Sequence, residues 1–175
     1  MAACGQELTK RDAESATVPV RGFLPPISLC DTVMGLLTDL FIATKSEARR
    51  YEGRLNDDDF DIDAHYPRAS HKGVTGVELS QLWACMLGEA LSAKHLFEPV
   101  SSEADSGLTE HLPQPFVKLL AGTPEDRLEK LAAAWSSGSE ITLTPAELTP
   151  LLRDLTSLAR RAVSAKKDLF VWYCP

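Results

Sequence analysis

The chain has 175 residues, of which 44% are hydrophobic and 25% are charged, a composition that argues against a wholly disordered or fibrous protein. Lys and Arg total 18 against 25 Asp and Glu, and the resulting net charge of −7 makes nucleic acid a poor partner. The apolar runs are too short to span a bilayer, so we also expect no membrane partner.

The sequence predicts one α+β domain, mostly helical, with a small sheet that includes the C-terminal strand. Residues 1–16 are polar and without periodicity, so we expect a flexible N-terminal segment followed by a single domain over 17–175. The start of the chain lacks the apolar stretch of a secretory signal, and the cysteines form no closely spaced motif. We therefore expect a cytoplasmic protein with four reduced thiols and no cofactor.

An edge strand and a helix are predicted before residue 51. Thr17–Leu24 has the composition of a strand, which Pro19 confines to a sheet edge. Ser28 with Asp31 matches a helix cap, and apolar residues then recur at helical spacing. This apolar face consists of Leu29, Val33, Leu36, Leu37, Leu40 and Phe41. Residues 51–72 are expected to be the least regular part of the domain.

Helix caps mark three further helices. Thr75 with Glu78 forms a capping box that starts a helix running to about Leu91. A second helix starts at Thr123–Pro124, where a proline in the first turn costs no hydrogen bond. The third starts at Thr144–Pro145, although Pro150 makes a start or a bend nearer that residue an open alternative.

The chain closes with Asp168–Pro175, an aromatic and β-branched run that predicts a buried strand. Such a strand must pair with an earlier segment. The candidates are Thr17–Leu24 and the region around Phe60–Tyr66. The tryptophans are all expected to face the core: Trp83, Trp135 and Trp172.

The densest charge is a cluster of aspartates between positions 57 and 63. From Asp59 onward the acids alternate with apolar residues, so in an extended chain they would share one face. Like charges repel one another, which favours a counter-charge from a basic partner protein or a cation. An EF-hand starting at Asp59 fits poorly, because Ala64 and Ser70 occupy the glycine and glutamate positions. The aspartates are Asp57, Asp58, Asp59, Asp61 and Asp63.

The simplest alternative for this region is a solvated acidic loop without a partner. Two further interpretations also stay open. In one, His65 or His71 and neighbouring carboxylates form the site of a small, hydrolase-like enzyme. In the other, the aspartates form a divalent-cation-binding module. Because the chain has no G-x-S-x-G, H-E-x-x-H or phosphate-binding glycine motif, no residue is assigned a catalytic or metal-binding role.

The C-terminal half resembles a group of small uncharacterised bacterial proteins. The segments that carry this resemblance are LEKLAAAW, LTPAELTPLLRDLTSLARRAV and LFVWYCP, together with KGVTGVELSQLWACMLG. In those proteins a last amphipathic helix precedes a hydrophobic final strand. The resemblance implies a bacterial origin and one α+β domain, and it transfers no activity.

The preferred interpretation is a non-enzymatic protein-binding module, such as an inhibitor or immunity-type protein that masks a basic surface of its partner. Acidic side chains would speed the encounter, and matched charges would give specificity. The expected contacts are the five aspartates of the cluster, with Phe60 and Tyr66 as apolar anchors.

Overall fold

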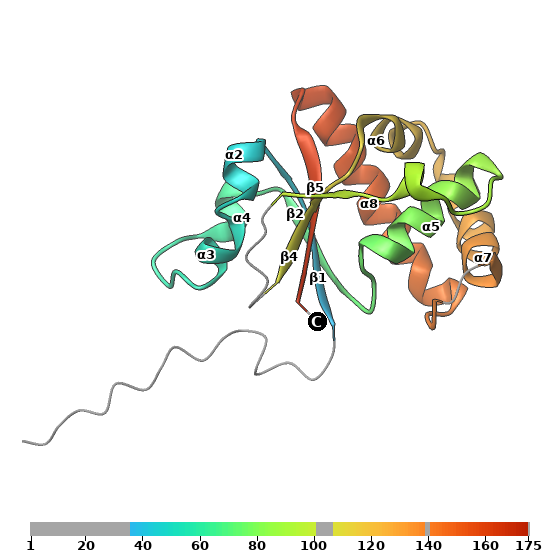
Figure 1. The fold of residues 1–175 in the computed structure, drawn as a ribbon, viewed down its shortest axis with the longest axis horizontal. Coiled ribbons are helices and arrows are strands. Elements are labelled where there is room, and N and C mark those ends of the chain that lie inside the picture. Colours follow the sequence, from blue (N-terminus) through green and yellow to red (C-terminus); the bar gives the residue numbers. More distant parts are fainter. Residues whose placement is uncertain (1–35, 101–106, 139–140, 175) are drawn as a thin grey trace, which may run out of the picture.

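The computed structural model describes residues 36–100, 107–138 and 141–174. A five-stranded antiparallel sheet with strand order β2-β1-β5-β4-β3 separates two groups of helices (Figure 1). The predicted α+β class, mostly helical with a sheet that includes the C-terminal strand, is confirmed. The N-terminal segment over 1–16 and the strand predicted at Thr17–Leu24 lie outside the described residues.

The central strand of the sheet is the last one in the chain. It pairs with β1 from Leu37↔Cys174 to Ala43↔Asp168, and β4 lies along its other edge. The partner expected around Phe60–Tyr66 is wrong, because that stretch forms a turn and a short helix. The strands are β1 (Leu37–Ala43), β2 (Arg68–Lys72), β3 (Glu98–Pro99), β4 (Leu108–His111) and β5 (Asp168–Cys174).

The prediction of a helix through Leu37, Leu40 and Phe41 is wrong, because these residues form strand β1. Successive side chains of a strand point to opposite faces, and both faces of β1 are covered, so Leu40, Phe41 and Ile42 are all buried. A short run that is apolar on both faces shows no period of two, and a helical spacing then fits it by coincidence. The predicted start of this helix precedes the described residues.

The helices divide between the two faces of the sheet, with the first three along the chain on one side and the long ones on the other (Figure 1). One group is α2 (Lys45–Ala48), α3 (Tyr51–Leu55) and α4 (Ile62–His65). The other is α5 (Gly76–Leu87), α6 (Gln114–Ala121), α7 (Leu128–Gly138) and α8 (Pro145–Ala165). Two 3-10 turns, η1 (Ala93–His95) and η2 (Glu125–Arg127), precede β3 and α7.

Two of the three helix starts predicted from caps are confirmed. The start predicted at Thr123–Pro124 is wrong for the α-helix, because residues Glu125–Arg127 form the 3-10 turn η2 without a side-chain cap and α7 begins at Leu128. Thr75 and Thr144 each form the expected capping box, with Glu78 and Glu147. Helix α8 begins at Pro145 and continues through Pro150, so a start at the second proline is wrong. Helix α5 ends at Leu87, earlier than predicted, because the following Gly88 adopts a left-handed conformation that stops the helix.

The larger core lies between the sheet and α5–α8. Leu40 and Ile42 of β1 and Leu169 and Val171 of β5 face helices whose buried side chains are mostly leucines. Trp83 and Trp135 belong to this core and Trp172 to the opposite one, and all three are buried, as predicted.

The smaller core lies under α2–α4 and is rich in aromatic rings. Phe41 of β1, with Phe170 and Trp172 of β5, meets Tyr51 and Tyr66 on this face. The rings of Phe41 and Tyr51 stack with their centroids 3.7 Å apart and their planes 10° from parallel. Aromatic packing therefore holds the short helices against the sheet.

Two cysteines fall within the described chain and differ in state. Cys85 is a free thiol, partly buried, and burial raises its pKa. Cys174 is disulfide-bonded, so the expectation of four reduced thiols is wrong for this residue. In residues 36–100, 107–138 and 141–174, none of the helices has the length and apolar character needed to cross a membrane.

Candidate functional site

The aspartate cluster lies on a lobe over the smaller core. Residues 51–65, which comprise α3, α4 and the turn between them, are called the acidic lobe below. The extended arrangement that the alternation of acids suggested is not formed at Asp61. Its carboxylate accepts a hydrogen bond of 3.1 Å from the Ala64 amide and caps α4, which turns the following residues into a helix.

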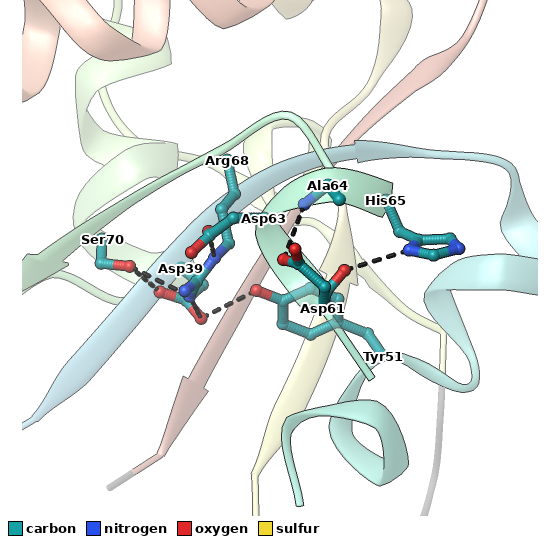
Figure 2. A network of polar contacts seen from close by, with 8 residues as sticks. All are labelled: Asp39, Tyr51, Asp61, Asp63, Ala64, His65, Arg68 and Ser70. Atoms are coloured by element: carbon teal, nitrogen blue, oxygen red, sulfur yellow. Dashed lines mark hydrogen bonds and ion pairs between the residues drawn. The ribbon is translucent and has the colours of Figure 1, made fainter. Parts of the chain in front are cut away.

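A buried carboxylate under the acidic lobe joins it to the sheet (Figure 2). Asp39 of β1 is only 1% exposed. Its Oδ2 accepts hydrogen bonds from the Tyr51 hydroxyl at 2.8 Å and from Arg68 Nη1 at 3.0 Å. Its Oδ1 accepts a third hydrogen bond, of 2.5 Å, from the Ser70 hydroxyl. Three donors, one of them the Arg68 guanidinium, thus offset the cost of burying this charge.

Strand register explains why these side chains meet. Ser70 of β2 lies opposite Asp39 of β1, and Arg68 lies opposite Phe41, so all of them occupy the face covered by the acidic lobe. Tyr51 reaches the same carboxylate from the first position of α3. Burial, together with the charge of Asp39 and the hydrogen bond to it, raises the pKa of Tyr51, so the phenol stays a hydrogen-bond donor.

Arg68 connects the buried carboxylate to the surface of the acidic lobe. While Nη1 binds Asp39, Nε donates to Asp63 Oδ1 at 2.6 Å (Figure 2). The hydrogen bond and the charge of Arg68 lower the pKa of Asp63. One guanidinium therefore holds α4 and β1 together from opposite sides.

The five aspartates differ in what they contact. Asp57 is paired with Arg54 at 2.8 Å and Asp63 with Arg68. Among the described residues, Asp58, Asp59 and Asp61 form no ion pair, and all three are exposed. The negative charge that is both exposed and without an ion pair in the described chain is thus carried by three of the five predicted positions.

The two predicted apolar anchors also differ. Tyr66 is 6% exposed, and its ring meets Phe41 and Tyr51 edge to face, so it belongs to the smaller core. Phe60 is half-buried at the edge of the acidic lobe. The Arg54 guanidinium lies 4.6 Å from its ring centroid, and the His65 ring lies 4.3 Å away.

The structure does not bring His65 and His71 together. His65 is exposed on α4, where its Nδ1 lies 3.0 Å from the Asp61 carbonyl oxygen. His71 faces the other side of the sheet, with Nε2 3.1 Å from Asp154 Oδ2 of α8. Two more imidazole–carboxylate contacts, which the sequence did not indicate, join His95 to Glu89 and His111 to Asp168.

The polar network beneath the acidic lobe lacks the order of a hydrolytic triad. The Ser70 hydroxyl donates directly to Asp39, with no imidazole between the hydroxyl and the carboxylate. Across the described segments, no group of three or more His, Cys, Asp or Glu side chains is placed to hold a metal ion. The hydrogen bonds of this network instead attach α3 and α4 of the acidic lobe to strand β1.

Sequence reasoning missed the residues of that support: Asp39, Tyr51, Arg68 and Ser70. One signal for them was present, because Asp39 interrupts the apolar run LTDLFIA. A charge inside a buried run requires a partner, since an unpaired buried carboxylate is very costly. Its partner Arg68 is 29 positions away, and local patterns do not reveal such a pairing.

Comparisons of the chain with protein-family models, curated proteins and solved structures found no match. The resemblance of the C-terminal half to small bacterial proteins therefore stays a prediction.

Proposed function

We propose that the chain is a non-enzymatic protein-binding module, of the inhibitor or immunity type and of bacterial origin, that masks a basic surface of its partner with the acidic lobe. The observation that supports this proposal most directly is the charge left open on the lobe. Asp58, Asp59 and Asp61 are exposed and without ion pairs in the described chain, on a surface fixed to the sheet through Asp39 and Arg68.

A fixed surface of this kind favours binding for two reasons. Exposed charge of one sign steers an oppositely charged partner and raises the association rate. A surface that is already ordered avoids the entropy cost of immobilising side chains during binding. In this proposal Phe60 is the apolar contact at the edge of the lobe, and Tyr66 supports it from the core.

The test compares three forms of the full chain in affinity capture from the native organism, followed by quantitative mass spectrometry. The first is the wild type, and the second carries D58N/D59N/D61N. Asparagine caps helices as well as aspartate does, so the Asp61 substitution preserves the start of α4. The third is a matched control, E89Q/E98Q/E129Q, which neutralises three exposed acids elsewhere.

The proposal expects a basic protein that the wild type and the control retain, that D58N/D59N/D61N loses, and that high salt releases. With that protein in hand, stopped-flow mixing at low salt should show association slower by about tenfold or more for the lobe variant. Equal retention by all three forms would overturn the proposal, and so would unchanged association rates at low salt.

The compartment belongs to the same proposal and has its own test. The sequence indicates the cytoplasm, whereas the disulfide at Cys174 is a feature found chiefly in oxidising compartments. Cell fractionation combined with thiol alkylation measures both at once. A cytoplasmic chain with Cys174 open to alkylation supports the proposed location, and an exported chain with Cys174 protected contradicts it.

A further inference from the structure

A groove lies between α5, α6, η2 and α7, on the opposite side of the sheet from the acidic lobe. Its volume of about 820 Å³ falls in the range of binding sites, roughly 300–1,000 Å³. The floor is apolar, because Met86, Leu119 and Leu131 line the groove and pack partly buried against the larger core. Leu87, which follows Met86, is 45% exposed and extends the apolar surface at the end of α5.

The charge around the groove is opposite in sign to that of the whole chain. Lys118, Arg127 and Lys130 line it against the single carboxylate of Asp126, in a protein of net charge −7. All four side chains are exposed. Within the segments described here, none of them forms an ion pair. An apolar floor therefore meets a cationic rim whose charges are uncompensated.

The wall of the groove is held in place from behind. Arg160 of α8 donates from Nε to the Ala121 carbonyl at 3.1 Å and from Nη2 to the Thr123 carbonyl at 2.5 Å. The Thr123 hydroxyl donates to the Leu119 carbonyl at 3.0 Å. These bonds fix the turn between α6 and η2, so a ligand would meet a preformed surface.

We propose that this groove binds an acidic peptide segment of a partner protein, with apolar side chains on the floor and carboxylates at the three cations. The choice of an acidic ligand rests on charge complementarity with the three cations of the rim. A nucleic acid is disfavoured, because the net charge repels a long polyanion and the aliphatic floor offers no aromatic ring for base stacking. The proposal is independent of the function proposed for the acidic lobe, which lies across the sheet.

The test uses fluorescence anisotropy with the full chain and a labelled synthetic peptide in which aspartate and leucine alternate. A second peptide replaces leucine with serine and keeps the charge. The variant K118Q/R127Q/K130Q removes the cationic rim. The matched control R49Q/K72Q/R161Q removes three exposed cations outside the groove and changes the net charge equally.

The expected result is binding of the leucine peptide to the wild type and to the control, weakened about tenfold or more in K118Q/R127Q/K130Q because three charge pairs are lost. The serine peptide should bind more weakly than the leucine peptide. Equal weakening by both triple variants would show attraction to net charge only and would overturn the proposal, as would the absence of binding to the wild type.

A blocking substitution tests the location without changing charge. Gly122 lines the groove with φ −80°, and a Cβ there meets only the Lys118 and Leu119 carbonyl oxygens, at 3.5 and 3.7 Å. The Cβ of G122F therefore has room, and its ring should prevent peptide binding. A circular dichroism spectrum like that of the wild type checks the fold, and unchanged binding by the folded variant would overturn the assignment.

Sedimentation of the wild type at several concentrations examines whether the occupant is a second copy. Self-association abolished both by K118Q/R127Q/K130Q and by D58N/D59N/D61N would place the acidic lobe of another copy in the groove, and would overturn the proposal of a partner protein. A monomer that binds the leucine peptide supports the proposal.

Discussion

One face of the sheet is covered by helices of 8 to 21 residues, and the other by helices of only four or five. The long helices supply many leucines, so the larger core gains its stability from apolar area. The short helices supply few side chains, and the smaller core uses stacked aromatic rings and a partly buried ion pair instead. A small lobe is thus held by fewer, more specific contacts than a helical layer.

Each face also holds a carboxylate that is shielded from solvent, fully at Asp39 and partly at Glu110, and the two differ in their partners. Asp39 under the acidic lobe is paired with Arg68 and accepts two further hydrogen bonds. Glu110 of β4 faces the long helices, where its Oε2 occupies the space that a Cβ on Gly76 would need. In the described chain this Oε2 has no hydrogen-bond partner. Burial raises the pKa of Glu110, although a hydrogen bond from Tyr173 acts in the opposite direction.

The largest expected effect is the loss of the partly buried ion pair of Asp39 and Arg68 under the acidic lobe. Asp39→Ala leaves the Arg68 guanidinium and the Tyr51 hydroxyl without their acceptor, which should cost about 3–5 kcal/mol of unfolding free energy. Urea titration measures the loss. Asp39→Asn is the control, since it retains an acceptor and should cost less. A loss below about 1 kcal/mol, the range of an exposed ion pair, would show that the network does not anchor the lobe.

A smaller effect, a gain of stability instead of a loss, is expected from a substitution of Glu110 on the other face of the sheet. The pKa of Glu110 is raised above its ordinary 4.5, so the folded state holds this proton more tightly than the unfolded state. The contribution to stability is present below pH 4.5 and is lost as the pH rises through the raised value. Glu110→Gln should therefore stabilise the protein at neutral pH and flatten that decline. Thermal unfolding between pH 4 and 8 checks it, and a destabilised variant at neutral pH would contradict it.

The smallest effect is expected at Asp63, which is 74% exposed. Arg68 lowers its pKa below the ordinary 3.8, so its contribution to stability is present above that value and is lost as the pH falls through the lowered one. Asp63→Asn should lower the stability slightly at neutral pH, where the contribution is present, and should reduce the loss of stability below about pH 4 by the same small amount. Acid titration followed by circular dichroism measures the difference, with Asp58→Asn as the unpaired control. An identical acid transition in both variants would show that the ion pair of Asp63 with Arg68 does not contribute to stability.

Prediction from the sequence succeeded where one short segment contains the whole signal. The capping boxes at Thr75 and Thr144 and the final strand are such cases. It failed at β1, whose two apolar faces imitate a helical pattern, and at Asp61, whose carboxylate caps a helix in a segment that reads as extended. Prediction from the sequence located the acidic cluster, but it did not show which of the five aspartates are exposed and unpaired.

The sequence by itself determined the helix starts at these caps, the buried tryptophans and the strand that ends the fold, because their signals are local or are carried by a single strongly apolar segment. Only the tertiary structure decided that Arg68 meets Asp39, that His65 and His71 lie on opposite sides of the sheet, and that a cationic groove forms between helices. Those features depend on strand register and on helix packing. Both bring together residues far apart in the chain, and no local spacing encodes such contacts.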